Sequence, residues 1–173
     1  GRRKFFLDDL ISKYVPSFTK VGILDDFNPK DLTYTSITPK NKIIIHHLLT
    51  HTSGTVYGEI DGNPQIRSIN WKRGLPDIFA SGQTMEEITN AIAAQPLHHK
   101  PGKQYNYSLG LDVLGYFVEL MWGITFSEFL RTRIFDPLDM KDTYFTLPEE
   151  KHKRLVPVFT RNEGEWAVYN SSF

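Results

Sequence analysis

The sequence predicts a helix-rich α+β fold. Capping-box motifs begin at Thr84 and Thr125, and apolar residues at helical spacing follow each of them. Pairs of short β-prone segments near both ends of the chain predict two small hairpins. Because 173 residues are enough for one domain with a buried core, we expect a single domain or part of one.

The N-terminal part is expected to contain a helix, a hairpin and a second helix. Apolar side chains at helical spacing predict a short helix over residues 5–15, ended by the proline that follows. Two β-prone runs, 21–24 and 32–37, flank Asn28-Pro29 and predict a small hairpin or a pair of loops. The pattern of residues 43–49 predicts the second helix.

The middle of the chain combines a loop with two helices. Residues 55–83 have no sustained period and contain recurrent Gly, Pro and Asn, so we expect a long loop. The capping box from Thr84 to Glu87 predicts the next helix. Ser108 is expected to cap a long apolar helix that Gly123 closes.

The last part is expected to hold one more helix and a hairpin. The capping box at Thr125 opens a helix with Phe126 and Ile134 on its apolar face, and Pro137 lies just past its end. Residues 155–160 and 165–169 predict the second hairpin.

Composition excludes several classes of partner. Twenty Lys and Arg balance twenty Asp and Glu, so no general electrostatic surface for nucleic acid or anionic membrane is expected. No apolar stretch approaches the roughly 20 residues of a transmembrane helix. The absence of cysteine excludes disulfides, a thiol nucleophile and a thiolate metal site.

The N-terminus has neither an initiator Met nor a signal segment. We therefore expect the chain to begin inside a longer gene product. The sequence does not indicate a cellular compartment.

Two local patterns resemble catalytic or metal motifs. His47 and His51 have the spacing of two ligands on one helix face, but no acidic residue or third ligand accompanies them. We expect these rings and that of His46 to cap or buttress a turn, with no metal and no cofactor. Ser17 and Lys20 match Ser-x-x-Lys, yet a Gly-containing β-prone run follows, which favours an ordinary polar stretch.

Tyr107 lies on a turn directly before the long apolar helix. The positive end of a helix modestly favours a phenolate, so this tyrosine is a candidate catalyst. The alternative is a half-buried structural aromatic.

Three stretches, in order, resemble the serine β-lactamase-like hydrolases, the superfamily of class C β-lactamases, D-alanyl-D-alanine carboxypeptidases and related esterases. Leu7 to Pro16 is similar to its "LDDPVSKYLP" segment, and His47 to Gly54 to its "HLLTHTSG" signature. Pro101-Gly102, Tyr107-Ser108 and Leu114-Gly115 continue the pattern, and residues 137–145 resemble "PLGM.DT.F" with Asp139 in place of the glycine. The resemblance covers about residues 7 to 160.

The resemblance implies a catalytic role for Tyr107 as the tyrosine of the family's Tyr-x-Asn element, which assists proton transfer from and to the nucleophilic serine. The third position is Leu109, which resembles the esterase branch and argues against β-lactam hydrolysis. Asp139 suggests a changed turn rather than changed chemistry. The substrate-binding residues are not indicated.

The family's Ser-x-x-Lys nucleophile belongs upstream of the "LDDPVSKYLP" segment, so Ser17 is not its counterpart. The Lys/His-Thr/Ser-Gly strand belongs downstream of Phe173. We therefore expect residues 1–173 to be one partial domain, the helical subdomain of a β-lactamase/transpeptidase-like fold, without the nucleophile segment and the C-terminal sheet strands. Such a chain is expected to be inactive alone, because both oxyanion-hole amides come from the missing segments.

The expected function of the parent protein is acyl transfer through a serine ester intermediate, most simply as a carboxylesterase acting on a small ester or amide. Alternatives are a β-lactamase, a D-Ala-D-Ala carboxypeptidase, or a non-enzymatic relative that uses the fold for binding or scaffolding. A further alternative is an independent small helical binding domain.

Overall fold

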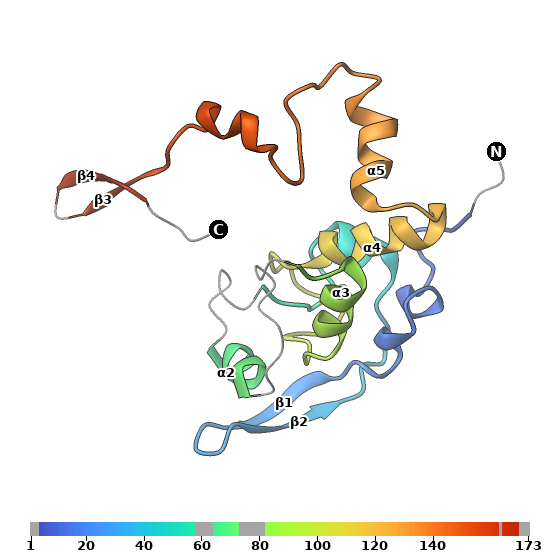
Figure 1. The fold of residues 1–173 in the computed structure, drawn as a ribbon. Helices are drawn as coiled ribbons and strands as arrows, with labels where there is room; N and C mark the ends of the chain where they lie inside the picture. The colour runs from blue at the N-terminus through green and yellow to red at the C-terminus, as the bar shows by residue number, and fades with distance from the viewer. Residues whose placement is uncertain (1–3, 58–63, 73–81, 163, 170–173) are drawn as a thin grey trace. The chain divides into compact units, whose positions relative to one another are not determined.

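The computed structural model describes residues 4–57, 64–72, 82–162 and 164–169 (Figure 1). The chain divides into two compact units, Gly1–Phe129 and Leu130–Phe173. Each unit contains one two-stranded antiparallel sheet, and most of the helices lie in the first. The predicted helix-rich α+β class with two small hairpins is confirmed.

The prediction of one helix over residues 5–15 is wrong. Two 3-10 helices form instead, over Ile11–Lys13 and Pro16–Lys20. The backbone N–H of Ile11 donates to the carbonyl oxygen of Ile43 at 3.1 Å. This long-range bond takes the donor that a continuous helix would use, and a local periodicity cannot reveal it.

The first predicted hairpin is confirmed. Strand β1, Ile23–Asn28, pairs antiparallel with β2, Thr33–Ile37. The N–H of Leu24 donates to the carbonyl of Leu97 at 2.9 Å, and the N–H of Leu97 donates to the carbonyl of Gly22 at 2.8 Å. These bonds anchor the base of the hairpin to the chain segment that leads toward Tyr107.

Two of the predicted helices form at the expected places. Helix α1, Ile45–Leu49, falls within residues 43–49, and α3, Met85–Ala93, follows the first capping box. The hydroxyl of Thr84 accepts from the N–H of Glu87 at 3.2 Å, and the Glu87 carboxylate accepts from the N–H of Thr84 at 2.8 Å. The capping box is therefore complete in both directions.

The long loop predicted over residues 55–83 is wrong in part, because α2, Pro64–Lys72, lies within it. The side chains of Ile66 and Ile69 are both buried and three residues apart, which orients one face of this helix inward. Two apolar residues are too few to produce a recognisable period in the sequence. Other residues of the predicted loop lie outside the described residues.

Helix α4, Gly110–Trp122, is the predicted long apolar helix, and Gly123 ends it at φ +70°. The predicted cap by Ser108 is wrong. The residue that precedes the helix is Leu109, and the Ser108 hydroxyl lies 3.4 Å from Nδ1 of His51 instead. The Ser108 hydroxyl therefore lies against a residue distant in sequence and does not cap the helix that follows it.

The helix predicted after Thr125 also forms. Helix α5, Phe126–Leu130, is capped by the Thr125 hydroxyl, which accepts from the N–H of Glu128 at 3.1 Å. It continues as a π-helical turn over Arg131–Phe135. Among the described residues no single helix is long and apolar enough to cross a membrane, although Gly110–Trp122 and Phe126–Phe135 meet that criterion together as a broken pair.

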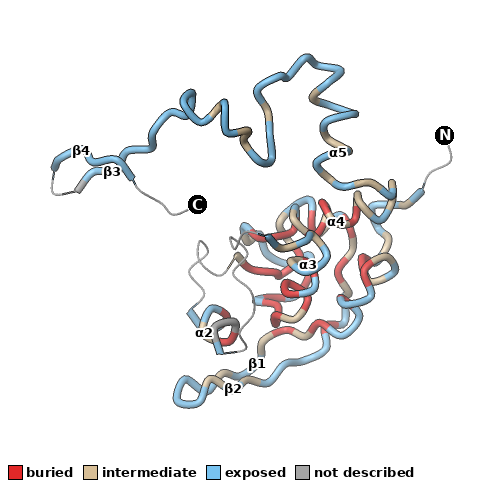
Figure 2. Tube along the Cα trace, viewed as in Figure 1, coloured by how far each residue is buried: buried red, intermediate tan, exposed pale blue. Residues whose placement is uncertain are grey.

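The first unit has a continuous hydrophobic core, drawn in red in Figure 2. Helices α1 and α4 approach closely there, since a Cβ added to Gly110 would lie 2.6 Å from the carbonyl oxygen of Leu48. The core comprises these buried residues: Ile11, Val15, Phe18, Val21, Ile23, Ile43, Ile45, Leu48, Ile92, Ala93, Leu97, Leu109, Val113 and Phe117.

The second unit consists of short elements. A 3-10 helix spans Glu149–Arg154, and the second predicted hairpin is confirmed as β3, Phe159–Asn162, paired with β4, Glu165–Val168. None of the residues described in this unit with a burial class is buried. Local hydrogen bonds and ion pairs connect parts of this unit.

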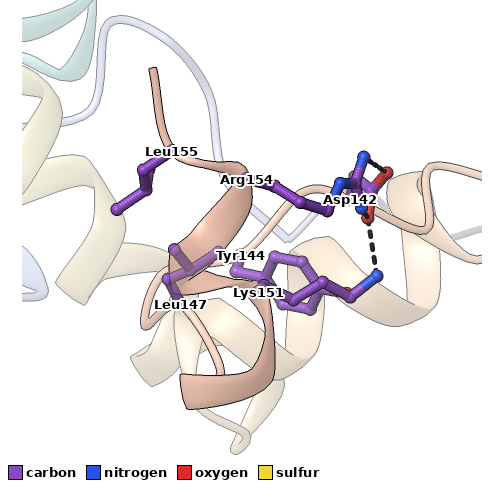
Figure 3. A pocket seen from close by; sticks show the side chains of 6 residues that line it. All are labelled: Asp142, Tyr144, Leu147, Lys151, Arg154 and Leu155. Carbon is purple, nitrogen blue, oxygen red and sulfur yellow. Dashed lines mark hydrogen bonds and ion pairs between the residues drawn. The ribbon is translucent and has the colours of Figure 1, made fainter. Parts of the chain in front are cut away.

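The main cluster of such bonds surrounds Asp142 (Figure 3). Both nitrogens at the tip of Arg154 donate to its carboxylate at 2.7 Å, and Lys151 Nζ donates at 2.8 Å. Arg154, and after it Lys151, hold the pKa of the Asp142 carboxyl well below its usual range. These contacts tie the residues after the π-helical turn to the 3-10 helix.

Candidate active site

Two segments far apart in the sequence lie side by side in the first unit. The N–H of Gly102 donates to the carbonyl of Thr52 at 2.8 Å, and the N–H of Asn106 donates to the carbonyl of His51, also at 2.8 Å. These backbone bonds align residues 51–54 with residues 102–108. Two of the motifs found in the sequence thus form one continuous surface.

His51 is the side chain that joins the two segments. Its backbone has φ +52°, the left-handed region, which turns the chain directly after α1. The backbone N–H of Ser108 donates to His51 Nδ1 at 3.2 Å. This bond fixes the orientation of the imidazole ring beside Ser108.

Tyr107 is held between two other rings. Its ring centroid lies 4.8 Å from that of His51 and 5.7 Å from that of Tyr57, with the two tyrosine rings nearly parallel at 22°. The residue is 48% exposed, and its hydroxyl makes no hydrogen bond within the described part of the chain. The phenol is therefore oriented by stacking and remains open to a ligand or another segment.

The neighbouring Tyr105 differs from Tyr107 in exposure and contacts. It is 70% exposed and reaches only the edge of His51, with ring centroids 6.0 Å apart. Two tyrosines of one segment are thus distinguished by packing, and Tyr107 is the one with more ring contacts.

A carboxylate lies on the helix behind this group of rings. Asp112 is in the first turn of α4, and partial burial raises the pKa of its carboxyl. Burial, followed by the charge of Asp112, raises the pKa of Tyr57. No Lys or Arg of the described residues contacts the Tyr107 ring, so its surroundings as described are aromatic rings.

The rest of the histidine cluster supports the turn. His47 is half-buried against Gly102, where a Cβ would lie 2.7 Å from His47 Nε2, and Nδ1 accepts from the N–H of Ile44 at 3.4 Å. Burial, and to a lesser degree His46, lowers the pKa of His47. No group of three His, Cys, Asp or Glu side chains is arranged for a metal within the described ranges.

The site has the order and spacing of a known family's motifs, and comparison with that family decides the assignment. The sequence model of the beta-lactamase family matches residues 1–169. The chain belongs to the beta-lactamase family.

Relatives in the beta-lactamase family include named esterases. Protein Rv1367c of Mycobacterium tuberculosis is 32% identical over 94% of this chain and 38% of its own length. Lovastatin esterase of Penicillium rubens is 32% identical over 90% of this chain and 36% of its own length. Esterase EstB of Burkholderia gladioli is 31% identical over 86% of this chain and 34% of its own length. The chain thus spans between a third and two-fifths of the length of these curated relatives.

Solved structures confirm the β-lactamase/transpeptidase-like fold. EstCE1, a hydrolase with promiscuous acyltransferase activity, aligns with a TM-score of 0.76 at 24% identity, over 99% of this chain and 40% of its own. Unliganded simvastatin synthase (LovD) from Aspergillus terreus, as the selenomethionyl derivative, gives a TM-score of 0.76 at 25% identity, over 95% and 40%.

The departures from the beta-lactamase family pattern have structural explanations. Leu109 is 2% exposed and belongs to the core, so the position occupied by Asn in the family's Tyr-x-Asn element presents no polar group here. Asp139 adopts φ +55°, the left-handed conformation that favours glycine. Asp139 therefore adopts the backbone conformation that a glycine would adopt at this position.

Ser17 lies elsewhere in the first unit. It is exposed on the 3-10 helix Pro16–Lys20, and neither Ser17 nor Lys20 hydrogen-bonds to a described side chain. The core residue of this turn is Phe18. The structure does not bring the Ser-x-x-Lys pattern to Tyr107.

Sequence reasoning missed two neighbours of Tyr107. His51 was considered as a turn or metal residue and as part of the family signature, and Tyr57 was not singled out. The available signal was positional: Tyr57 begins the predicted long loop, and long loops in compact domains are often functional. Their stacking on Tyr107 follows from tertiary packing.

Proposed function

We propose that the protein is a serine hydrolase of the beta-lactamase family that cleaves a small ester through a serine ester intermediate, with Tyr107 relaying protons. The observation that carries the proposal is the open, half-exposed phenol of Tyr107, oriented between the rings of His51 and Tyr57. By the motif resemblance, Tyr107 corresponds to the family's catalytic tyrosine. Relatives named as esterases support an ester substrate.

The chemistry assigned to Tyr107 is a two-way proton transfer. The serine Oγ attacks the ester carbonyl and its proton passes to the tyrosine oxygen, which then returns a proton to the departing alkoxide. Water repeats the sequence on the serine ester and releases the acid. Stacking on two rings limits the rotation of Tyr107, so the oxygen is presented in one orientation.

We also propose that the serine nucleophile lies outside residues 1–173. Ser17 is exposed on a surface turn and its pattern is not brought to Tyr107. A phenol has a pKa of about 10 in water and needs a nearby cation to act as a base at neutral pH. The described ring neighbours of Tyr107 are His51 and Tyr57, and neither is a Lys or Arg, so the cation would come from the family's lysine.

An ester is favoured over a β-lactam or a D-Ala peptide because Leu109 is buried. In the family's lactamases and peptidases an Asn amide at this position orients the substrate, and a core leucine cannot do so. The buried leucine at position 109 supports the choice of an ester as substrate.

The test uses the protein expressed at the full length of its reading frame, with p-nitrophenyl acetate, nitrocefin and a D-Ala-D-Ala peptide as substrates. Tyr107→Phe should lower kcat on the ester about 10²- to 10⁴-fold. The matched control is Tyr105→Phe, which removes the more exposed hydroxyl of the same segment and should retain activity.

Each contrary result has a defined meaning. Faster turnover of nitrocefin or the peptide than of the ester would contradict the substrate class. No turnover of any of them by a folded protein would favour a binding or scaffolding role. Residues 1–173 expressed alone should give neither burst nor turnover, and a burst that Tyr107→Phe abolishes would refute the external nucleophile.

A further inference from the structure

A pocket lies in the first unit. It has a volume of about 390 Å³ and lies where the base of the β1–β2 hairpin, residues 38–41 and the turn Lys100–Lys103 converge. The pairing of Ile23 with Ile37, and the bridge from Ile23 to Leu97, bring these three segments together. Tyr107 is not among its lining residues.

The lining includes an apolar surface. Ile23 and Pro39 are buried, whereas Ile37 is 46% exposed and presents apolar surface at the pocket. The volume falls in the range of about 300–1,000 Å³ that is usual for small-molecule sites. The pocket can therefore hold the apolar body of a small organic molecule.

The charged side chains that line the pocket are all positive. Lys40, Lys100 and Lys103 border the pocket, and no Asp or Glu is among its lining residues. None of the three lysines forms an ion pair within the described part of the chain. Because the whole chain has a formal net charge of zero, this concentration of positive charge is a local feature.

We propose that this pocket binds a small organic anion, a phosphate monoester or carboxylate attached to an apolar body. Three ammonium groups would surround the anionic end, and the isoleucines and the proline would contact the apolar end. The lysines come from two separate segments, so a single anion can bridge residues 38–41 to the Lys100–Lys103 turn. The proposal is independent of the proposed hydrolase activity.

The test is calorimetric titration of the full-length protein with 1-naphthyl phosphate at low salt. The variant Lys100→Gln/Lys103→Gln keeps most of the side-chain bulk and removes two charges, and it should raise Kd at least tenfold. The control Lys30→Gln removes an exposed lysine that does not line the pocket and should leave Kd unchanged. Equal urea midpoints would show that both variants remain folded.

Two further ligands separate the contributions of charge and apolar surface. Inorganic phosphate and the neutral 1-naphthylmethanol should each bind at least tenfold more weakly than 1-naphthyl phosphate. Equal affinity for the neutral compound, or an unchanged Kd in the double variant, would overturn the proposal. Lysine-dependent binding to phosphatidylserine vesicles without binding of 1-naphthyl phosphate would assign the charge to a membrane surface and would also overturn it.

Discussion

The two units of this chain are stabilised in different ways. The first buries a continuous apolar core, in which Leu48 is 0% exposed. The second also contains large apolar residues, yet Leu138 is 67% exposed and no residue given a burial class there is buried. Apolar content alone therefore does not make a core, and the described contacts of the second unit include hydrogen bonds and ion pairs such as those of Asp142.

The largest expected effect compares the same truncation in each unit. Leu48→Ala should lower the free energy of unfolding by about 2–5 kcal/mol, because it opens a cavity in the core. Leu138→Ala should change it by less than about 0.5 kcal/mol. Urea denaturation of the full-length protein measures both. A comparable loss at Leu138 would show that this side chain is buried in the full protein and would break the comparison.

The next effect concerns two glycines of the first unit. A Cβ at Gly54, which has φ +86°, would lie 2.4 Å from the carbonyl oxygen of His99, so Gly54→Ala should cost about 3 kcal/mol. Gly123 has φ +70° with no atom within 4 Å of such a Cβ, and Gly123→Ala should cost only about 1 kcal/mol. Equal losses in urea denaturation would mean that the contact at Gly54 relaxes.

A smaller and local effect is expected at Asp142. Because its folded pKa lies below the ordinary 3.8, the unfolded segment binds protons more readily. The stabilisation is therefore present above about pH 3.8 and is lost as the pH falls through the folded value. Asp142→Asn removes it at neutral pH and should speed amide exchange at Lys151 and Leu155, whose N–H groups bond within the 3-10 helix.

The control for that experiment is Asp136→Asn, which breaks the exposed ion pair to Arg131 alone. It should leave exchange at Lys151 and Leu155 unchanged. Unaltered exchange in Asp142→Asn would indicate that the second unit is ordered by something other than this cluster.

The smallest effect is expected at Asp139, which holds φ +55° in an exposed turn. Asp139→Gly relieves the left-handed strain but adds freedom to the unfolded chain, so stability should change by less than about 0.5 kcal/mol. Asp139→Ala keeps the strain without the local polar group and should cost about 1 kcal/mol. The rate of amide exchange at Met140, whose N–H donates to the carbonyl of Phe135, measures the effect of both substitutions. A large increase in stability in Asp139→Gly would show that the backbone at position 139 is more strained than its φ angle implies.

The parts of the fold that local rules control were predictable. The capping box of Thr84 and Glu87, the glycine that ends α4 and both hairpins follow from interactions between residues close in sequence. The motif order also identified the family, and with it Tyr107 as the candidate catalyst. The prediction of a short helix over residues 5–15 was wrong, because the N–H of Ile11 donates to the carbonyl of Ile43.

The sequence by itself determined the helix-rich class, the family and the candidate tyrosine, since each depends on residue order and local propensity. Only the tertiary structure decided the surroundings of that tyrosine: His51 accepting from Ser108, Tyr57 stacked on the ring and Leu109 turned into the core. These contacts join segments separated by about fifty residues. No local pattern encodes them, because they arise when the whole core packs.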